Sequence, residues 1–381
     1  MTKPLIISVG YGTHMFVEGN PERQRMQQCA AHTDHLHMIV FTSRSAGLQT
    51  QHVSPQLTLH PTNARHRVGM IIAAVRIALR LTKPAVSPVA NTIITTQDAF
   101  ATGIVGWVIK RVRGVRLVVQ EHGDVFLQPY WRGESLVNQV QYKIGLRVLP
   151  TADAVRVVSK RIHDKLITLG IPPARLVSLP VSVDLAAFTQ KSTYRSATQA
   201  APFQLITAAR LVPQKNLTLL LQAFKAAWLQ NNQLRLTIVG SGPEQAALTA
   251  RLQAQYVGVA SPVTMVAWSD DVGSLLRAAD AYILTSNYEG WARVLIEAMV
   301  TGLPTITTQV GCAGEVLLHD VHGMIVPVGD QAALTQAILT MSTDTARYAE
   351  FVDRLQQLDP HTIPGTQSAS YGQQWVATLA I

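Results

Sequence analysis

The chain of 381 residues is 48% hydrophobic and only 14% charged, which is enough apolar material for two globular cores and excludes disordered and fibrous classes. The net charge of +9 is concentrated in residues 1–190, which contain 21 Lys and Arg against 10 Asp and Glu, yet no basic run with interleaved aromatic residues predicts a nucleic-acid partner. Cys29 and Cys312 lie far apart without a metal-ligand or C-x-x-C spacing, so we expect neither a disulfide scaffold nor a zinc site, and a reducing compartment.

Short β-branched runs alternate with helical patterns from the N-terminus onward, an order that is typical of an α/β unit with a parallel sheet. In the first half, strands are expected over 5–9, 36–41, 92–95, 116–120, 154–158 and 176–179, and helices over 20–32, 66–81, 98–113, 135–149 and 159–169. Asn20, Pro21 and Glu22 open the first helix as an N-cap, a first-turn proline and an acid that complements the helix dipole. The first apolar run is too short for a signal peptide, and no uninterrupted run reaches the roughly 20 residues that span a bilayer, so we expect neither a leader nor a transmembrane helix.

The composition changes over residues 189–201, which are rich in Gln, Ser, Thr and Ala and are predicted to form an interdomain linker. The α/β pattern then restarts, with strands over 203–208, 234–239, 263–266, 282–285 and 305–308, helices over 217–230, 243–252, 271–278 and 292–300, and two or three helices after residue 330. We therefore predict two Rossmann-like domains, 1–188 and 202–365, that face each other across a cleft. A final helix within 366–381 can return to the first domain.

The segment 286–299 carries the clearest chemical pattern. A strand leads through a glycine turn into a helix, and the free N–H groups of Trp291 and Ala292 at the helix start can face an anion. Glu289 and Glu297 are eight residues apart, about 12 Å at a helical rise of ~1.5 Å per residue. This separation suits a ligand with hydroxyl groups at both ends and a diphosphate between them, as in a nucleotide sugar. Two solvated surface glutamates are the alternative.

This segment resembles the E-x7-E motif of the retaining glycosyltransferases of family 4, which have the GT-B fold and commonly show the form E-G-W/F-x-x-V-L-x-E-A-M. The resemblance implies that Glu289 is a catalytic residue that contacts the donor hexose and that Glu297 binds the donor ribose. It also implies that the helix start contacts the donor diphosphate, with Arg293 and Val294 as further candidates for the donor site. Many relatives carry glycine where this chain has Ala292.

A basic pair, Arg210 and Lys215, follows the first strand of the second domain. An arginine fork and a lysine point charge can converge on one diphosphate, whereas the alternative is a basic loop before a helix capped by Asn216. The segment is similar to the family's G-R-x-x-x-x-K-N motif, with Ala209 in place of its glycine. The resemblance therefore implies that both cations bind the leaving diphosphate, where negative charge builds during transfer.

Two further strand ends of the second domain match the order of the family. Gly240 and Gly242 form a G-x-G-P turn, which is a weak signal by itself, and Val266 and Ala267 follow the next strand. The resemblance implies that these four residues lie near the nucleotide base. No D-x-D metal motif is present. We therefore expect metal-independent transfer without a cofactor, in which the cations and helix N–H groups take the place of a divalent ion.

In the first domain, His122 and Asp124 follow a strand, at the carboxyl edge where open α/β sheets bind ligands. A lone histidine is often structural, but this one resembles the family's active-site histidine, which implies a catalytic role, and Asp124 is a candidate for orienting it or the acceptor. Gly10 and Gly12 resemble the glycine loop that approaches the donor phosphates in GT-B enzymes, although the usual adjacent Gly-Gly pair is absent. These implied roles make 1–188 the acceptor domain and 202–365 the donor domain.

Taken together, the resemblance implies a retaining hexosyltransferase that moves a sugar from a UDP- or GDP-sugar to an acceptor hydroxyl in cell-envelope glycan, polysaccharide or glycolipid synthesis. The expected acceptor is a carbohydrate or a lipid-linked glycan. The basic first half favours a cytoplasmic protein that touches an anionic membrane surface at the inner face of the cell membrane. A generally basic surface is the alternative reading of the same charge.

Other functions of the same fold class are weighed against this one. A nicotinamide-dependent oxidoreductase would need G-x-G-x-x-G followed by an acidic ribose ligand, and this pattern is absent. A sugar-nucleotide epimerase and a non-catalytic nucleotide-sugar-binding protein stay open. Product analysis with and without an acceptor separates the epimerase from the transferase, and donor turnover excludes the binding protein.

Overall fold

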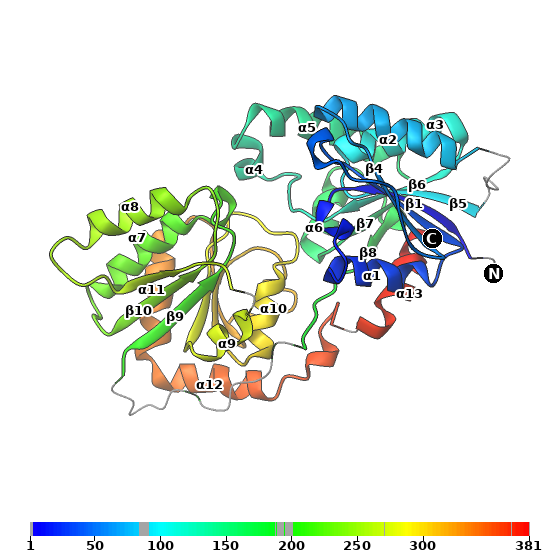
Figure 1. Ribbon diagram of the computed structural model, residues 1–381. Coiled ribbons are helices and arrows are strands. Elements are labelled where there is room, and N and C mark those ends of the chain that lie inside the picture. Colours follow the sequence, from blue (N-terminus) through cyan, green and yellow to red (C-terminus); the bar gives the residue numbers. More distant parts are fainter. Residues whose placement is uncertain are drawn as a thin grey trace. The chain divides into compact units, whose positions relative to one another are not determined.

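The computed structural model describes residues 3–83, 91–186, 188, 194, 201–269, 271–366 and 368–380. Its contacts divide the chain into two compact units, one formed by Met1–Ser182 with Gln367–Ile381 and the other by Val183–Thr366. Each unit contains a sheet of mainly parallel strands joined through helices (Figure 1). The prediction of two Rossmann-like α/β domains is therefore confirmed.

The sheet of the first unit has eight strands in the order β3-β4-β2-β1-β5-β6-β7-β8, and only the pair β3 and β4 is antiparallel among them. The strands are β1 (Leu5–Gly10), β2 (His35–Val40), β3 (Gln51–Ser54), β4 (Leu57–Pro61), β5 (Thr92–Thr96), β6 (Arg116–Glu121), β7 (Ala154–Val157) and β8 (Leu176–Ser178). The helices are α1 (Pro21–Ala30), α2 (Arg67–Leu81), α3 (Ala101–Arg113), α4 (Pro129–Gly133), α5 (Leu136–Val148), α6 (Lys160–Thr168) and α13 (Ser368–Ala380). Because β1 lies between β2 and β5, the strand order reverses there, which is where open α/β sheets bind ligands.

Three elements of the first unit, β3, β4 and α4, are absent from the predicted set. The strands β3 and β4 lie within a stretch of Gln, His, Ser and Pro, whose polar residues and proline hide the period-two pattern of a strand. Nevertheless Leu57 and Leu59 are buried, because β4 pairs with β2 inside the sheet. The helix α4 has only five residues, too few for a helical periodicity to be visible in sequence.

The sheet of the second unit has six parallel strands in the order β11-β10-β9-β12-β13-β14. The strands are β9 (Phe203–Ala208), β10 (Leu234–Val239), β11 (Val263–Val266), β12 (Ala281–Leu284), β13 (Thr305–Thr308) and β14 (Gly323–Val326). The helices are α7 (Leu217–Trp228), α8 (Gln245–Gln255), α9 (Val272–Arg277), α10 (Arg293–Val300), α11 (Gln331–Thr343) and α12 (Thr345–Gln356). Only β14 lies outside the predicted strands; it is short and begins at Gly323, where a Cβ would lie 2.0 Å from the Thr305 carbonyl oxygen.

The last helix belongs to the first unit. α13 packs against α1, as the red and blue helices of Figure 1 show, and also contacts β5 and β7. Its residues Tyr371, Trp375 and Leu379 are buried in one hydrophobic cluster with Met26 and Cys29 of α1. The division between the units falls at residues 182/183 and 366/367, close to the predicted boundaries, and most of the predicted linker 189–201 lies outside the described residues. Of the helices that the structure describes, none combines the length and apolar character that crossing a bilayer requires.

Candidate active site

Two loops at the carboxyl edge of the second sheet are joined by hydrogen bonds. The strands β9 and β12 are neighbours, and the loops that follow them contain the two motifs of this unit. The Asn287 N–H donates to the Gln214 carbonyl oxygen at 2.8 Å, and the Asn216 amide donates to the Asn287 side-chain oxygen at 2.9 Å. The Gln214 amide donates to the Tyr288 carbonyl oxygen at 2.9 Å. These bonds fix one loop against the other.

The joined loops contain a buried ion pair. Lys215 Nζ lies 2.5 Å from Glu289 Oε1, and the two side chains are 14% and 10% exposed. Ser286 Oγ donates to the same carboxylate oxygen at 2.6 Å, and Gln214 Nε2 donates to the other oxygen at 3.4 Å. The structure thus brings together the acid of one predicted motif and the lysine of the other.

The second acid of the E-x7-E pattern, Glu297, lies on α10 and is half-buried. Burial raises the pKa of its carboxyl group, and the nearby Arg293 partly opposes that increase. Tyr282 of β12 is fully buried and donates to the Ala208 carbonyl oxygen at 3.2 Å. Burial raises the pKa of Tyr282, and the charges of Glu297 and Glu289 raise it further. The charges of both carboxylates thus act on the same buried tyrosine.

The helix predicted over 292–300 begins one residue later in the structure, at Arg293. α10 begins at Arg293, so Trp291 and Ala292 precede it and the N–H groups of its first turn begin with Arg293 and Val294. Trp291 is buried, and its carbonyl oxygen accepts from the Cys312 N–H at 3.1 Å. Ala292 has a left-handed φ of 58°, which interrupts the helical backbone before α10.

Arg210 is the member of the predicted phosphate clamp that the structure leaves most exposed. It follows Ala209 directly after β9, and within the described part of the chain its guanidinium group makes no ion pair or hydrogen bond. Its side chain is therefore not drawn into the pair formed by Lys215 and Glu289. The expected convergence of Arg210 and Lys215 on one diphosphate stays a prediction.

The glycine turn after β10 packs against the loop that carries Arg210. A Cβ on Gly240 would lie 1.9 Å from the Ala209 carbonyl oxygen, and one on Gly242 would lie 2.4 Å from that of Leu211. The Gly240 N–H donates to the Val266 carbonyl oxygen at 3.0 Å. Glycine is required at these positions because the two backbones approach so closely.

Next along the same sheet, Ala267 follows Val266 at the end of β11 and is exposed. The four residues predicted near the base thus lie on neighbouring strand ends.

The first unit has its own cavity, of about 320 Å³, at the carboxyl ends of β1, β5 and β6. Tyr11 and His122 both line it. The Tyr11 N–H donates to the Gln97 side-chain oxygen at 2.7 Å, and a Cβ on Gly10 would lie 2.3 Å from that oxygen. Gly12 has a left-handed φ of 103°. The glycine loop and the predicted catalytic histidine therefore border the same cavity.

His122 is exposed to solvent in this cavity, whereas Asp124 is buried. Surrounding protein lowers the pKa of His122, and the positive charges of Arg156 and Arg25 lower it further, so the imidazole is neutral near pH 7. Asp124 pairs with Lys165, whose Nζ lies 2.5 Å from Oδ1. The carboxylate of Asp124 is thus held by Lys165 of α6 (Lys160–Thr168), and among the described contacts none joins it to His122. That Asp124 orients His122 or the acceptor stays a prediction.

Several residues of these sites escaped the motif-based prediction. Ser286 and Gln214 hold the Glu289 carboxylate, and their positions beside the two motifs are the signal that could have identified them. Arg156, Gln120 and Tyr371 border the cavity of the first unit. No sequence signal joins these three, because they come from β7, β6 and the distant helix α13.

Two family models match the chain: Glycosyltransferase Family 4 over residues 27–187 and Glycosyl transferases group 1 over residues 190–357. The chain is 26% identical over 256 residues to the UDP-Gal:alpha-D-GlcNAc-diphosphoundecaprenol alpha-1,3-galactosyltransferase of Escherichia coli. That match covers 64% of this chain and 64% of the relative, so the chain spans slightly less than two thirds of the relative's length.

Solved structures share the architecture. Anabaena Alr3699/HepE in complex with UDP superposes with a TM-score of 0.72 at 17% identity over 100% of both chains. Sucrose-phosphate synthase from Thermosynechococcus elongatus has a TM-score of 0.74 at 20% identity, covering 99% of this chain and 100% of that one. These neighbours have the GT-B fold, and the two family matches together cover most of the sequence. The chain therefore belongs to the glycosyltransferases of the family 4 type.

Proposed function

We propose that this protein is a retaining glycosyltransferase that transfers a hexose from a UDP- or GDP-sugar to an acceptor hydroxyl, without a metal ion, in the synthesis of a cell-envelope polysaccharide or glycolipid. The observation that carries the proposal is the buried pair of Lys215 and Glu289 on the joined ends of β9 and β12. The Glu289 carboxylate accepts hydrogen bonds and the paired Lys215 ammonium group donates them, so the site presents both signs of charge. Such a site suits a ligand that carries sugar hydroxyls next to phosphate oxygens.

Each charged side chain has a part in this proposal. Glu289 accepts hydrogen bonds from the donor hexose, and Glu297 accepts them from the ribose hydroxyls. Lys215 uses one of its three N–H groups on Glu289, which leaves two for phosphate oxygens. Arg210 adds an exposed guanidinium group, and within the described residues no carboxylate forms an ion pair with it. Together the two cations stabilise the negative charge that develops on the leaving diphosphate.

The acceptor side of the proposal rests on the first unit. The Escherichia coli relative is named for an acceptor that carries a diphosphoundecaprenol, which is a membrane lipid. In α5 of this chain, Leu136, Val137 and Val140 are 78%, 53% and 57% exposed, and Lys143 and Arg147 follow on the same helix. An exposed apolar and basic helix suits the surface of an anionic membrane, so we include peripheral membrane contact in the proposal.

The first experiment identifies the donor. A panel of UDP- and GDP-sugars is screened against the wild-type chain by thermal shift, because a bound ligand raises the apparent stability. The best donor is then used in transfer assays with and without EDTA, and NMR of the product gives its anomeric configuration. We expect retention of configuration and the same rate in EDTA. An inverted product or a rate lost in EDTA contradicts that part of the proposal.

The second experiment tests the role of Glu289. Glu289→Gln is expected to lower the rate of transfer by about 100-fold or more, because it removes a carboxylate that faces the reacting sugar. Glu350→Gln on α12 is the matched control, since Glu350 is exposed and far along the chain from both motifs. Wild-type activity in Glu289→Gln overturns the assignment. Conversion of the donor to an epimer without any acceptor supports the epimerase instead.

A further inference from the structure

The first unit buries a positive charge without a negative partner. Arg156 of β7 is 1% exposed. Its Nη1 donates to the Gln120 side-chain oxygen at 2.5 Å, and its Nη2 donates to the Leu179 carbonyl oxygen and to the Tyr371 hydroxyl, both at 2.9 Å. All of these acceptors are neutral, and Nε has no hydrogen-bond partner. Among the residues that the structure describes, no carboxylate forms an ion pair with Arg156.

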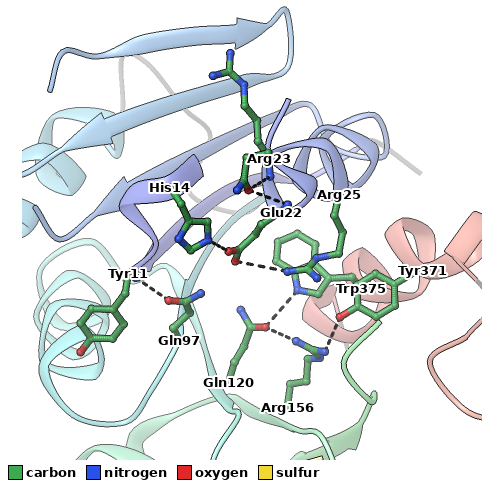
Figure 2. A network of polar contacts seen from close by, with 11 residues as sticks. Tyr11, His14, Glu22, Arg23, Arg25, Gln97, Gln120, Arg156, Tyr371 and Trp375 are labelled. Carbon is green, nitrogen blue, oxygen red and sulfur yellow. Dashed lines mark hydrogen bonds and ion pairs between the residues drawn. The ribbon is translucent and has the colours of Figure 1, made fainter. Parts of the chain in front are cut away.

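The neutral partners orient this guanidinium group firmly. The Gln120 side-chain oxygen also accepts from Trp375 Nε1 at 3.2 Å (Figure 2). Its amide nitrogen donates to Thr95 Oγ1 at 2.9 Å, so the amide cannot turn freely. Tyr371 and Trp375 come from α13, which therefore closes one side of the arrangement (Figure 2). A buried, fixed and uncompensated charge is unfavourable unless a counter-charge arrives.

Arg156 borders the 320 Å³ cavity, and so does a second arginine, Arg25 of α1. Arg25 Nη2 lies 3.5 Å from Glu22 Oε1, a long contact, and Glu22 also contacts His14 (Figure 2). One carboxylate thus serves two basic groups, and it does not reach Arg156. The positive charges of both arginines act on His122, which lines the same cavity.

We propose that this cavity is an oxyanion subsite in which Arg156 and Arg25 bind a phosphate or diphosphate group of the acceptor. The inference rests on the proposed glycosyltransferase function and adds the chemical class of its acceptor. Arg156 has one Nη1 hydrogen and its Nε–H left over from its bonds to neutral acceptors, and a guanidinium N–H is a strong donor to phosphate oxygens. A cavity of this volume accommodates a small ligand group. An acceptor held there by its phosphate keeps the rest of the molecule beside His122.

The direct test is calorimetric titration of the full chain with inorganic pyrophosphate. Because pyrophosphate can also bind the candidate donor site, the background is Arg210→Gln/Lys215→Met/Glu289→Gln, which removes the two proposed phosphate-binding cations and does not leave the Glu289 carboxylate without Lys215. We expect binding to persist in this background. Adding Arg25→Gln is expected to weaken it about tenfold, through loss of one charged hydrogen-bond donor. Arg23→Gln is the control, since Arg23 lies on the same helix and bonds to Phe16 and Gln51 outside the cavity.

A second variant separates ligand binding from folding. Arg156→Met removes the buried charge at similar side-chain length but also removes the donor to the Gln120, Leu179 and Tyr371 oxygens. We expect it to stay folded without urea while losing pyrophosphate binding. If Arg156→Met is strongly destabilised and the background chain binds no pyrophosphate, Arg156 is structural and the proposal is overturned. Equal weakening by Arg23→Gln and Arg25→Gln also overturns it, because the cavity then has no special role.

Transfer assays identify the source of the oxyanion. The KM of a prenyl-diphosphate-linked sugar is compared with that of a neutral alkyl glycoside of the same sugar, and Arg25→Gln is expected to raise the first about tenfold relative to the second. If pyrophosphate does not bind and a uronic acid acceptor is preferred, the oxyanion recognised by the cavity is a carboxylate. That result refutes the phosphate assignment. If the wild type transfers sugar but binds no pyrophosphate, this inference alone fails. If no donor is turned over, the proposed function fails, and the titration still measures the cavity.

Discussion

Replacing Lys215 with methionine should reveal the energetic cost of the buried pair at the centre of the candidate site. Breaking a buried ion pair from one side costs about 3–5 kcal/mol, and because the two side chains keep 14% and 10% exposure we expect the lower end, about 3 kcal/mol at pH 7. Without its lysine partner, the Glu289 carboxylate can be neutralised by binding a proton. Protonation costs about 1.4 kcal/mol for each pH unit above an ordinary glutamate pKa of ~4.3. The loss is therefore limited to about 1 kcal/mol at pH 5.

The assay is urea unfolding of wild type, Lys215→Met and Lys215→Met/Glu289→Gln between pH 5 and pH 8. The double variant removes both charges and should lie within about 1 kcal/mol of the wild type at every pH. In a unit of this size, a loss of 1 kcal/mol lowers the melting temperature by about 2–4 °C, so thermal scans give an independent measurement. A loss in Lys215→Met that does not change with pH, or a double variant no more stable than the single one, refutes the reasoning.

Three further variants test the second unit. Ala292→Gly should raise stability by about 1 kcal/mol, since the left-handed φ of 58° is strained for alanine; unchanged or reduced stability in urea contradicts that strain. Glu297→Gln should raise the melting temperature of the ligand-free protein at pH 7, because burial raises the pKa of the Glu297 carboxyl group in the folded state. In the wild type, the contribution of this group to stability is fully present below the unfolded-state pKa of ~4.3 and is lost as the pH rises through the folded-state pKa. The stability advantage of the variant should therefore vanish near pH 4. Gly240→Ala should cost about 3 kcal/mol by forcing a Cβ against the Ala209 carbonyl oxygen, and a variant as stable as the wild type would show that the turn can move apart.

Most strands of the two sheets could be predicted closely because each is a short buried run rich in β-branched residues, whereas β3, β4 and β14 were missed. The observed β9 and β13 have the predicted bounds, and the buried Thr305 and Thr307 show how such a run fits inside a sheet covered on both faces. The strands β3 and β4 were hidden because polar residues and prolines interrupt their pattern, although Thr58 of β4 is buried inside the sheet beside Leu57 and Leu59.

The candidate site was only partly predictable for a different reason. Sequence motifs place Lys215 and Glu289 each at a strand end, but their contact depends on β9 lying next to β12, and that neighbour relation arises from the order of strands in the folded sheet. The start of α10 was misplaced because Ala292 adopts a left-handed φ, which no intrinsic preference of alanine indicates. Arg156 gave no signal at all, since its partner Tyr371 lies 215 residues away in sequence.

Lys215 of the second unit and Arg156 of the first are held in opposite ways, and this difference has a consequence for binding. The charge of Lys215 is already neutralised by Glu289, so a bound phosphate must share the lysine with this carboxylate. Phosphate binding should therefore stabilise the second unit only slightly. Arg156 is held by neutral oxygens alone, so an anion in the cavity of the first unit removes an unfavourable burial of charge. Phosphate ligands should for this reason bind the first unit more tightly and, at the same free concentration, protect it against unfolding more than the second unit. Hydrogen exchange of amides on β7 and on β12, followed with increasing pyrophosphate, measures this difference directly.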